Sequence, residues 1–168
     1  MESFKKIISE DKKEKYKEVF QQVKAIISDE PDLIANLANI TSILKMNFDE
    51  FSWVGFYLLK YKELVLGPFQ GKPACVRIKK GVGVCGASIK ERKIIIVPDV
   101  SEFPGHIYCD PDSKSEIVIP MIKDGMPFGV LDVDSYKPNC FDDIDRFYLD
   151  NIIKHLIDSI VEYEKKNR

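Results

Sequence analysis

The chain has 168 residues, which is about one domain at roughly 150 residues per domain. Apolar residues make up 45% of it, enough for a sizeable core, and 25 Lys and Arg against 27 Asp and Glu leave a net charge of −2. This balance argues against a nucleic-acid partner, which normally requires a clear basic excess. The aliphatic runs are too short to cross a membrane and no apolar leader is visible over residues 1–6, so we expect a cytoplasmic protein.

Two helices are predicted over residues 1–48. Apolar side chains recur at helical spacing from Tyr16 to Ile27, with lysines and glutamates on the other side. The same period continues from Leu33 to Leu44, and Pro31 suits the first turn of this second helix.

The sequence changes character at Phe51, where strands and loops are predicted. The aromatic and apolar run Trp53–Leu59, followed after a short polar gap by Leu64–Leu66, is typical of a β-hairpin. The segments that follow are predicted, in order, as a loop from Gly67-Pro68 to Pro73, a short extended piece at 76–78, a glycine-rich loop at 81–86, a short helix at 87–92, a buried strand at 94–97 and a long irregular segment at 99–114.

The last third predicts a second hairpin and a long helix. Strands over 116–122 and 127–134 flank Asp124-Gly125, a strong turn signal, and Asp142 or Asp143 is expected to cap a helix within 141–166. Strands and helices are segregated along the chain, which favours the α+β class. We expect one domain over 1–168 with an antiparallel sheet of about six strands, its sheet and loops over 51–135, and the terminal helices on one face.

Four cysteines require an explanation: Cys75, Cys85, Cys109 and Cys140. No C-x-x-C pair is present, so a structural zinc site is not expected, although His106 precedes Cys109 by three residues. A lone cysteine is usually a small buried apolar residue, but three cysteines in predicted loops favour reactive thiols equally well. His106 and Lys114 are near enough in sequence to supply the cation that would activate a thiol in these loops.

Carboxylates and aromatic residues form two further candidate groups. Asp132 and Asp134 lie two positions apart in an apolar strand and therefore on one face, and Glu116 is in the partner strand. Either this face is solvated, or the acids line a pocket in which one has a raised pKa or all meet a cationic ligand. On the first strand, Trp53 and Tyr57 share a face; they are either core residues or the walls of a slot above Gly55 that would take an ammonium or thioether ligand.

These motifs occur together, in the same order, in a known family. The segments Trp53-x-Gly-Phe-Tyr57, Leu66-Gly-Pro-Phe-Gln-Gly71, Gly81-x-Gly-Val-Cys85-Gly, Phe103-Pro-Gly-His-Ile-x-Cys109 and Gly129-Val-Leu-Asp-x-Asp134-Ser resemble those of the free methionine-(R)-sulfoxide reductases, which are built on a GAF domain. The resemblance runs from about Phe51 to Asp145. Tyr108 departs from it, because a small residue is common just before the nucleophile.

The resemblance implies a role for each matching residue. Cys109 matches the nucleophile, and Cys75 and Cys85 match the other two cysteines, with Cys75 the better candidate for the direct resolver. The acidic residues that bind substrate and donate a proton match Glu116, Asp132 and Asp134, while Trp53 and Tyr57 match the aromatic pocket wall. Cys140 has no counterpart and is expected to be structural.

The implied activity needs no metal or cofactor. Cys109 would take the oxygen of free methionine (R)-sulfoxide, and the resulting sulfenic acid would condense with a second cysteine. A dithiol protein of thioredoxin type would then restore both thiols. Spare apolar surface on the terminal helices, and the resemblance, predict a homodimer. The alternative interpretation is a GAF sensor of small molecules or redox state without catalysis.

The strand register provides a sharper test of the site. A two-residue turn at Asp124-Gly125 would pair Glu116 with Val133 and place Glu116 on the face away from Asp132 and Asp134. The three acids meet only if Glu116 lies opposite Asp134, which needs a turn with an odd number of residues or a β-bulge near Pro120. We expect one of these two features.

Overall fold

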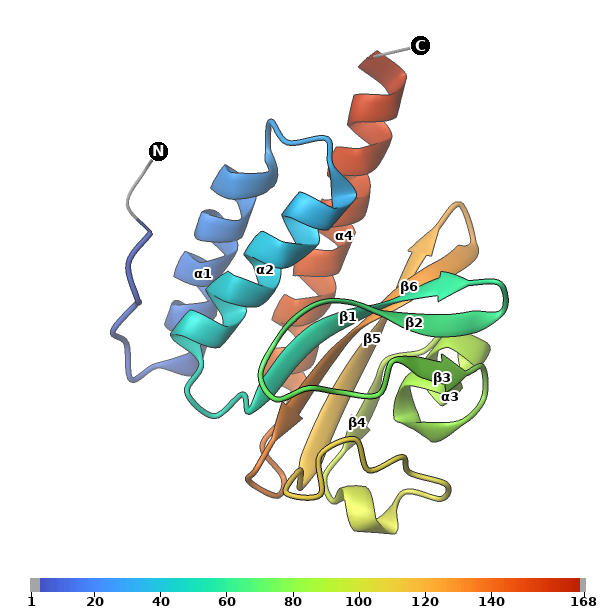
Figure 1. Cartoon of the computed structure of the whole chain (residues 1–168). Helices are drawn as coiled ribbons and strands as arrows, with labels where there is room; N and C mark the ends of the chain where they lie inside the picture. The colour runs from blue at the N-terminus through green and yellow to red at the C-terminus, as the bar shows by residue number, and fades with distance from the viewer. Residues whose placement is uncertain (1–3, 167–168) are drawn as a thin grey trace.

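A six-stranded antiparallel sheet divides the part of the chain that the structure describes, residues 4–166 of a computed structural model, into two layers (Figure 1). The expected α+β class is confirmed. In chain order the helices and strands are α1 (Lys12–Ile27), α2 (Leu33–Asn47), β1 (Trp53–Lys60), β2 (Glu63–Gln70), β3 (Arg77–Lys79), α3 (Gly83–Glu91), β4 (Ile95–Val97), a short 3₁₀ helix (Val100–Glu102), β5 (Ser115–Lys123), β6 (Met126–Ser135) and α4 (Asp143–Lys166). The strand order across the sheet is β3-β2-β1-β6-β5-β4.

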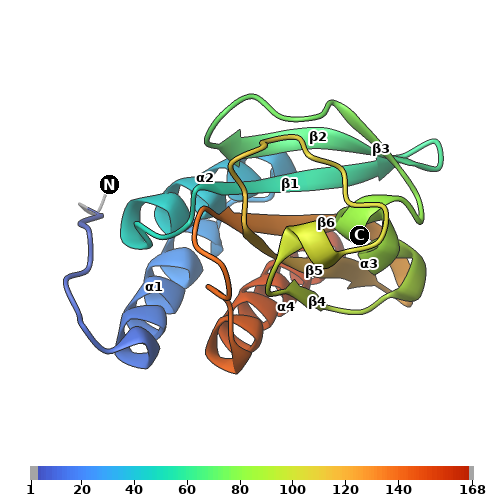
Figure 2. The same cartoon turned by 90° about the horizontal axis from the view of Figure 1, so that it is seen from below.

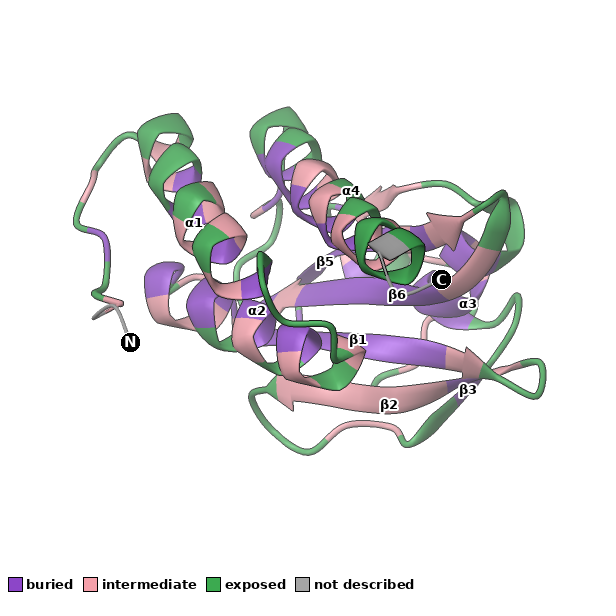
Figure 3. Cartoon of the chain, turned by 90° about the horizontal axis from the view of Figure 1, so that it is seen from above, coloured by how far each residue is buried: buried purple, intermediate pink, exposed green. Residues whose placement is uncertain are grey.

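The terminal helices lie on one face of the sheet, as predicted: α2 and α4 pack against the strands, and α1 packs on α2 and α4 (Figures 1 and 2). Each begins at an aspartate whose side chain accepts backbone N–H groups of the first turn: Asp11, Asp32 and Asp142. Four apolar residues of α1, Tyr16, Val19, Val23 and Ile27, are buried, and the helix packs against α2 and α4. The burial colouring of Figure 3 shows a similar inward face along α4. Pro31 precedes the Asp32 cap, so the expectation that it lies in the first turn of the helix is wrong.

Helix α3 and the long 99–114 segment cover the opposite face (Figure 2). The prediction of a glycine-rich loop at 81–86 is wrong, because α3 begins at Gly83 and contains Cys85. Here glycine permits close packing rather than flexibility: a Cβ on Gly86 would lie 2.4 Å from the Lys79 carbonyl oxygen. The prediction of a loop at Gly67-Pro68 is also wrong, because both residues belong to β2. They lie where the pairing of β2 with β1 is irregular. A proline is tolerated at such a position because it interrupts no regular hydrogen bond between the strands.

The β5–β6 hairpin contains both a two-residue turn and a bulge. Lys123 pairs with Met126 across Asp124-Gly125, whose φ angles of 51° and 73° are those of a type I′ turn. Ile122 then pairs with Pro127 but Met121 pairs with Gly129, so Phe128 is an extra residue. From there on the register is shifted, with Glu116 opposite Asp134. The expected bulge near Pro120 is confirmed.

Two further sequence predictions concern the strand at 94–97 and the start of the chain. The strand predicted at 94–97 is β4, which is only partly buried because it lies at the edge of the sheet. The beginning of the chain, where no apolar leader was visible, lies partly outside the described residues. Among residues 4–166 no helix combines the length and apolar character needed to span a membrane.

Candidate active site

A pocket opens on the α3 side of the sheet, above the centre of β1, β5 and β6. Strand alternation explains its composition, because the residues of these strands that line it are on the face directed away from the terminal helices. Seven of the eight site residues predicted from the sequence line it: Trp53, Tyr57, Cys85, Cys109, Glu116, Asp132 and Asp134. The eighth, Cys75, does not line the pocket but is covalently joined to Cys109.

The shifted register brings the three carboxyl groups together. Glu116 lies opposite Asp134 and Val118 opposite Asp132, so all three acids share the pocket face. Glu116 and Asp132 are only 5% and 7% exposed. Burial raises the pKa of each acid well above its usual range, and the neighbouring acids raise it further. The pocket therefore favours a carboxyl group that keeps its proton near neutral pH.

His106 is paired with one of these acids and does not serve as a cation for Cys109. Its Nε2 lies 3.2 Å from Glu116 Oε2, and burial lowers the pKa of the imidazole. A raised pKa on Glu116 and a lowered one on His106 together describe a neutral hydrogen-bonded pair rather than an ion pair. Lys114, the other cation expected beside Cys109, is exposed at the surface.

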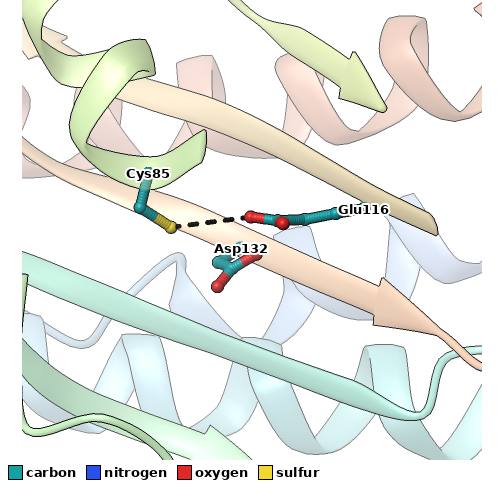
Figure 4. A group of neighbouring side chains, drawn as sticks. All are labelled: Cys85, Glu116 and Asp132. Atoms are coloured by element: carbon teal, nitrogen blue, oxygen red, sulfur yellow. Dashed lines mark hydrogen bonds between the residues drawn. The ribbon is translucent and has the colours of Figure 1, made fainter. Parts of the chain in front are cut away.

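Cys85, Glu116 and Asp132 converge on one point of the pocket (Figure 4). The Cys85 thiol donates to Glu116 Oε1 at 4.0 Å, and one ligand atom from each of the three residues lies within 4.8 Å of the others. Asp132 Oδ1 is buried and has no hydrogen-bond partner among the described residues. An unpaired buried carboxylate oxygen is costly. This point of the pocket is therefore suited to a positively charged ligand group, and these are the residues that could hold a metal cation.

A disulfide joins Cys75 and Cys109 at the rim of the pocket. Cys75 lies in the loop between β2 and β3, and Cys109 in the irregular segment before β5, 34 positions later. Cys85 remains a free, buried thiol whose pKa is raised by burial. Cys140 is also free, but it packs against the core on the side of the terminal helices, away from this pocket.

Trp53 and Tyr57 form one wall, although not the open slot that the sequence suggested. The Trp53 ring folds back over Gly55, so that a Cβ there would lie 2.2 Å from its Cη2 atom. The indole also stacks on Phe69 and donates its N–H to the Lys72 carbonyl oxygen. Tyr57 donates its hydroxyl to the Cys75 carbonyl oxygen and so ties the wall to the disulfide loop.

Sequence reasoning missed several polar partners. Ser113 donates its hydroxyl to Asp134 Oδ1 at 2.9 Å, and His106 was not expected beside Glu116. Both belong to the irregular 99–114 segment, which has no periodicity from which the direction of a side chain could be read. Only the path of that segment over the sheet brings these residues to the acids.

Comparisons with known proteins agree with this geometry. The GAF domain profile matches residues 29–159. The GAF domain-containing protein A of Dictyostelium discoideum is 54% identical over 86% of this chain and 92% of its own length, and the free methionine-R-sulfoxide reductase of Escherichia coli is 41% identical over 87% and 88%. The crystal structure of the free methionine-R-sulfoxide reductase of Neisseria meningitidis in complex with its substrate superposes with a TM-score of 0.93 at 42% identity, covering 99% of both chains.

An antiparallel six-stranded sheet with a pocket under α3, matched by the GAF profile over most of its length, defines a GAF-domain protein. Its acidic pocket and its cysteine pair distinguish one family among the GAF-domain proteins. At this level of identity and coverage, the chain belongs to the free methionine-R-sulfoxide reductase family.

Proposed function

We propose that this chain reduces free methionine (R)-sulfoxide to methionine, with Cys109 as the nucleophile. The observation that supports this most directly is the Cys75–Cys109 disulfide at the rim of a pocket that also contains Glu116, Asp132 and Asp134. A cysteine pair able to hold two electrons lies beside groups able to deliver a proton. Reduction of a sulfoxide requires both.

In the first step the Cys109 thiolate attacks the sulfur of the substrate, and a carboxylic acid protonates the sulfoxide oxygen. The net result is transfer of that oxygen to Cys109: the substrate sulfur is reduced by two electrons, Cys109 becomes a sulfenic acid, and methionine leaves. Glu116 is suited to the proton-donor role, because burial raises its pKa and its partner His106 is held neutral. The remaining acids face the ammonium group of a free amino acid, and Asp132 Oδ1 has no other partner among the described residues.

In the second step the Cys75 thiol gives up its proton and its sulfur attacks the sulfenic sulfur of Cys109; the S–OH bond breaks, and the hydroxyl group leaves as water with that proton. The existing disulfide supports Cys75 as the resolving residue. Cys85, which is buried in the pocket wall against Glu116, is assigned to the substrate site in this state. A dithiol protein of thioredoxin type in the cytoplasm then reduces the disulfide, with no metal or cofactor.

The proposal includes a homodimer, but the structure leaves less exposed apolar surface for it on the terminal helices than the sequence suggested. Most of the α1 stripe packs in the core, because Tyr16, Val19 and Val23 are fully buried. α4 still exposes Phe147 at 60%. An exposed aromatic side chain of this kind marks a candidate contact between subunits. Sedimentation equilibrium that gives the monomer mass at micromolar concentration would contradict the homodimer.

The assignment of residues 1–168 to one domain also stays a prediction.

The decisive experiment is an NADPH-consumption assay with thioredoxin, thioredoxin reductase and the separated sulfoxide epimers of free methionine. We expect consumption with the (R) epimer only, and none with Cys109→Ser. Dithiothreitol in place of thioredoxin separates a missing activity from a mismatched reductant. Saturable binding of the (R) epimer with no methionine formed under either reductant would reject the proposal in favour of a sensor.

A further inference from the structure

Lys72 connects the two loops that carry the disulfide. It lies three residues before Cys75, and its ammonium group reaches the segment that follows Cys109. Lys72 Nζ is 2.9 Å from Asp112 Oδ2 and 3.2 Å from Asp110 Oδ2. These ion pairs bridge segments 38 and 40 positions apart in sequence.

Asp110 is the centre of this network and is itself held in place. Its side chain is 15% exposed, and it accepts hydrogen bonds from the Tyr136 hydroxyl at 2.8 Å and from the backbone N–H of Asp112 at 3.0 Å. Tyr136 directly follows β6, and Lys72 Nζ lies 5.0 Å from the centre of its ring. The residue next to Cys109 is therefore fixed both to the loop of Cys75 and to the end of a central strand.

The second step of the proposed reaction depends on this kind of positioning. Cys75 and Cys109 are 34 positions apart, both in irregular segments, and the Cys75 sulfur must meet the sulfenic sulfur before water, oxidants or a second substrate do. Holding two reacting groups in place can accelerate their reaction strongly. Lys72 also lines the pocket, but the proposed mechanism gives it no other role.

We propose that Lys72 is a positioning residue for disulfide formation: through Asp110 and Asp112 its ammonium group holds the Cys109 segment against the Cys75 loop. This inference rests on the proposed function. The chemical step is the condensation given above, in which the S–S bond forms, the S–OH bond breaks and one water is released. Lys72 exchanges no proton or electron in it. A single exposed ion pair contributes little, but two pairs and a ring contact on one ammonium group act together.

The test compares Lys72→Met with Lys114→Met in a single turnover with the (R) epimer and no reductant. Lys114 is a matched control, since it is exposed, carries the same charge and lies in the Cys109 segment. Methionine formed per enzyme reports the first step, and the appearance of the disulfide, followed by quenching with a thiol-alkylating reagent, reports the second. Dimedone, which captures sulfenic acids, reports the intermediate between the two steps.

We expect about one equivalent of methionine from the wild-type protein and from both variants. Disulfide formation should be about threefold to tenfold slower in Lys72→Met, with more dimedone adduct, and unchanged in Lys114→Met. Lys72→Arg should restore most of the rate. Rising ionic strength should bring the wild-type rate down towards that of Lys72→Met, because salt screens exposed ion pairs, and leave Lys72→Met unaffected.

Disulfide formation at the wild-type rate in Lys72→Met would overturn the inference. So would a lower rate that does not respond to salt, or a variant that slows methionine formation while the disulfide then forms normally; the last result would assign Lys72 to the substrate. Absence of a methionine burst in the wild-type protein would instead refute the proposed function. Circular dichroism and the urea midpoint of Lys72→Met identify a variant that fails to fold, and Asp112→Asn, which removes one pair from the other side, then tests the same expectation.

Discussion

The two faces of the sheet place neighbouring residues of the same strands in opposite chemical environments. On β6, Leu131 and Val133 point into the apolar core under the terminal helices, while Asp132 and Asp134 point into the pocket. The helix face gains stability from every residue it buries. The pocket face buries carboxyl groups whose raised pKa values show that their charged forms are disfavoured. Burial of apolar residues on the helix face therefore offsets the destabilising burial of carboxyl groups on the pocket face, where those groups are needed for the chemistry.

Substitution of Cys109 or Cys75, both on the pocket face, should have the largest effect on activity of all the changes considered. Cys109→Ser should abolish turnover, because it removes the nucleophile, and the other free thiol of the pocket, Cys85, has a pKa raised by burial and is a poor substitute. Cys75→Ser should form about one equivalent of methionine and then stop. The coupled assay measures the first result and a methionine burst the second.

Cys140→Ser is the control for this pair. Cys140 lies on the side of the terminal helices, so its removal should leave activity nearly unchanged. Multiple turnovers by Cys109→Ser, or a comparable loss in Cys140→Ser, would show that the nucleophile has been misplaced.

A second experiment exchanges the two faces of β6. An alanine inserted between Gly129 and Val130 shifts the rest of the strand by one position, so Asp132 and Asp134 would turn towards the apolar core. We expect loss of folding or of all activity. Deletion of Phe128, by contrast, removes the bulge but leaves Met121 opposite Gly129 and Glu116 opposite Asp134.

The deletion of Phe128 should therefore cost stability, since Phe128 packs against the helix-face core, but keep measurable activity. Urea unfolding and the coupled assay distinguish these two outcomes. An inactive but well-folded deletion variant would mean that the bulge itself, and not the register beyond it, shapes the site.

Leu131→Ala should weaken the helix face. The side chain is fully buried, and truncations of this kind usually cost about 2–5 kcal/mol of unfolding free energy. Urea unfolding measures this loss. At temperatures where the variant remains folded, its activity per folded molecule should be close to wild type. A specific loss of activity would indicate that the two faces are coupled through the sheet.

Glu116→Gln should have a smaller effect of opposite sign on stability. The pKa of Glu116 is raised in the folded state, so the contribution of this group is fully present below about pH 4, its unfolded range, and is lost as pH rises through the folded pKa. The variant cannot ionise and should be more stable than wild type near pH 8. The difference should vanish near pH 4.

Urea unfolding at these two pH values tests this prediction, and Glu102→Gln, at an exposed position, should show no such pH dependence. Activity of Glu116→Gln should fall strongly if Glu116 is the proton donor. A variant that is less stable than wild type at both pH values would show that Glu116 is buried as a stabilised charge.

The α+β class, the cap of the C-terminal helix and both hairpins follow from the sequence because they depend on local periodicity and turn chemistry. Asp142, one of the two predicted residues, caps α4, and Asp124-Gly125 forms the expected turn. The family resemblance added the cysteine roles, which periodicity does not contain. The predictions that failed were at glycine and proline: Gly83 begins a helix and Pro68 continues a strand. Local propensity at those residues was outweighed by packing against distant backbone.

Contacts between distant segments were decided by the tertiary structure alone. A bulge at Phe128 was inferable only as one of two ways to bring Glu116 to Asp134, and the structure selects it. The pairing of His106 with Glu116, and the Lys72 network around Asp110, join irregular loops to other elements. Strand alternation determines which way a side chain points within its own strand. An irregular loop has no repeating geometry, so its side chains are placed only when the whole chain has packed.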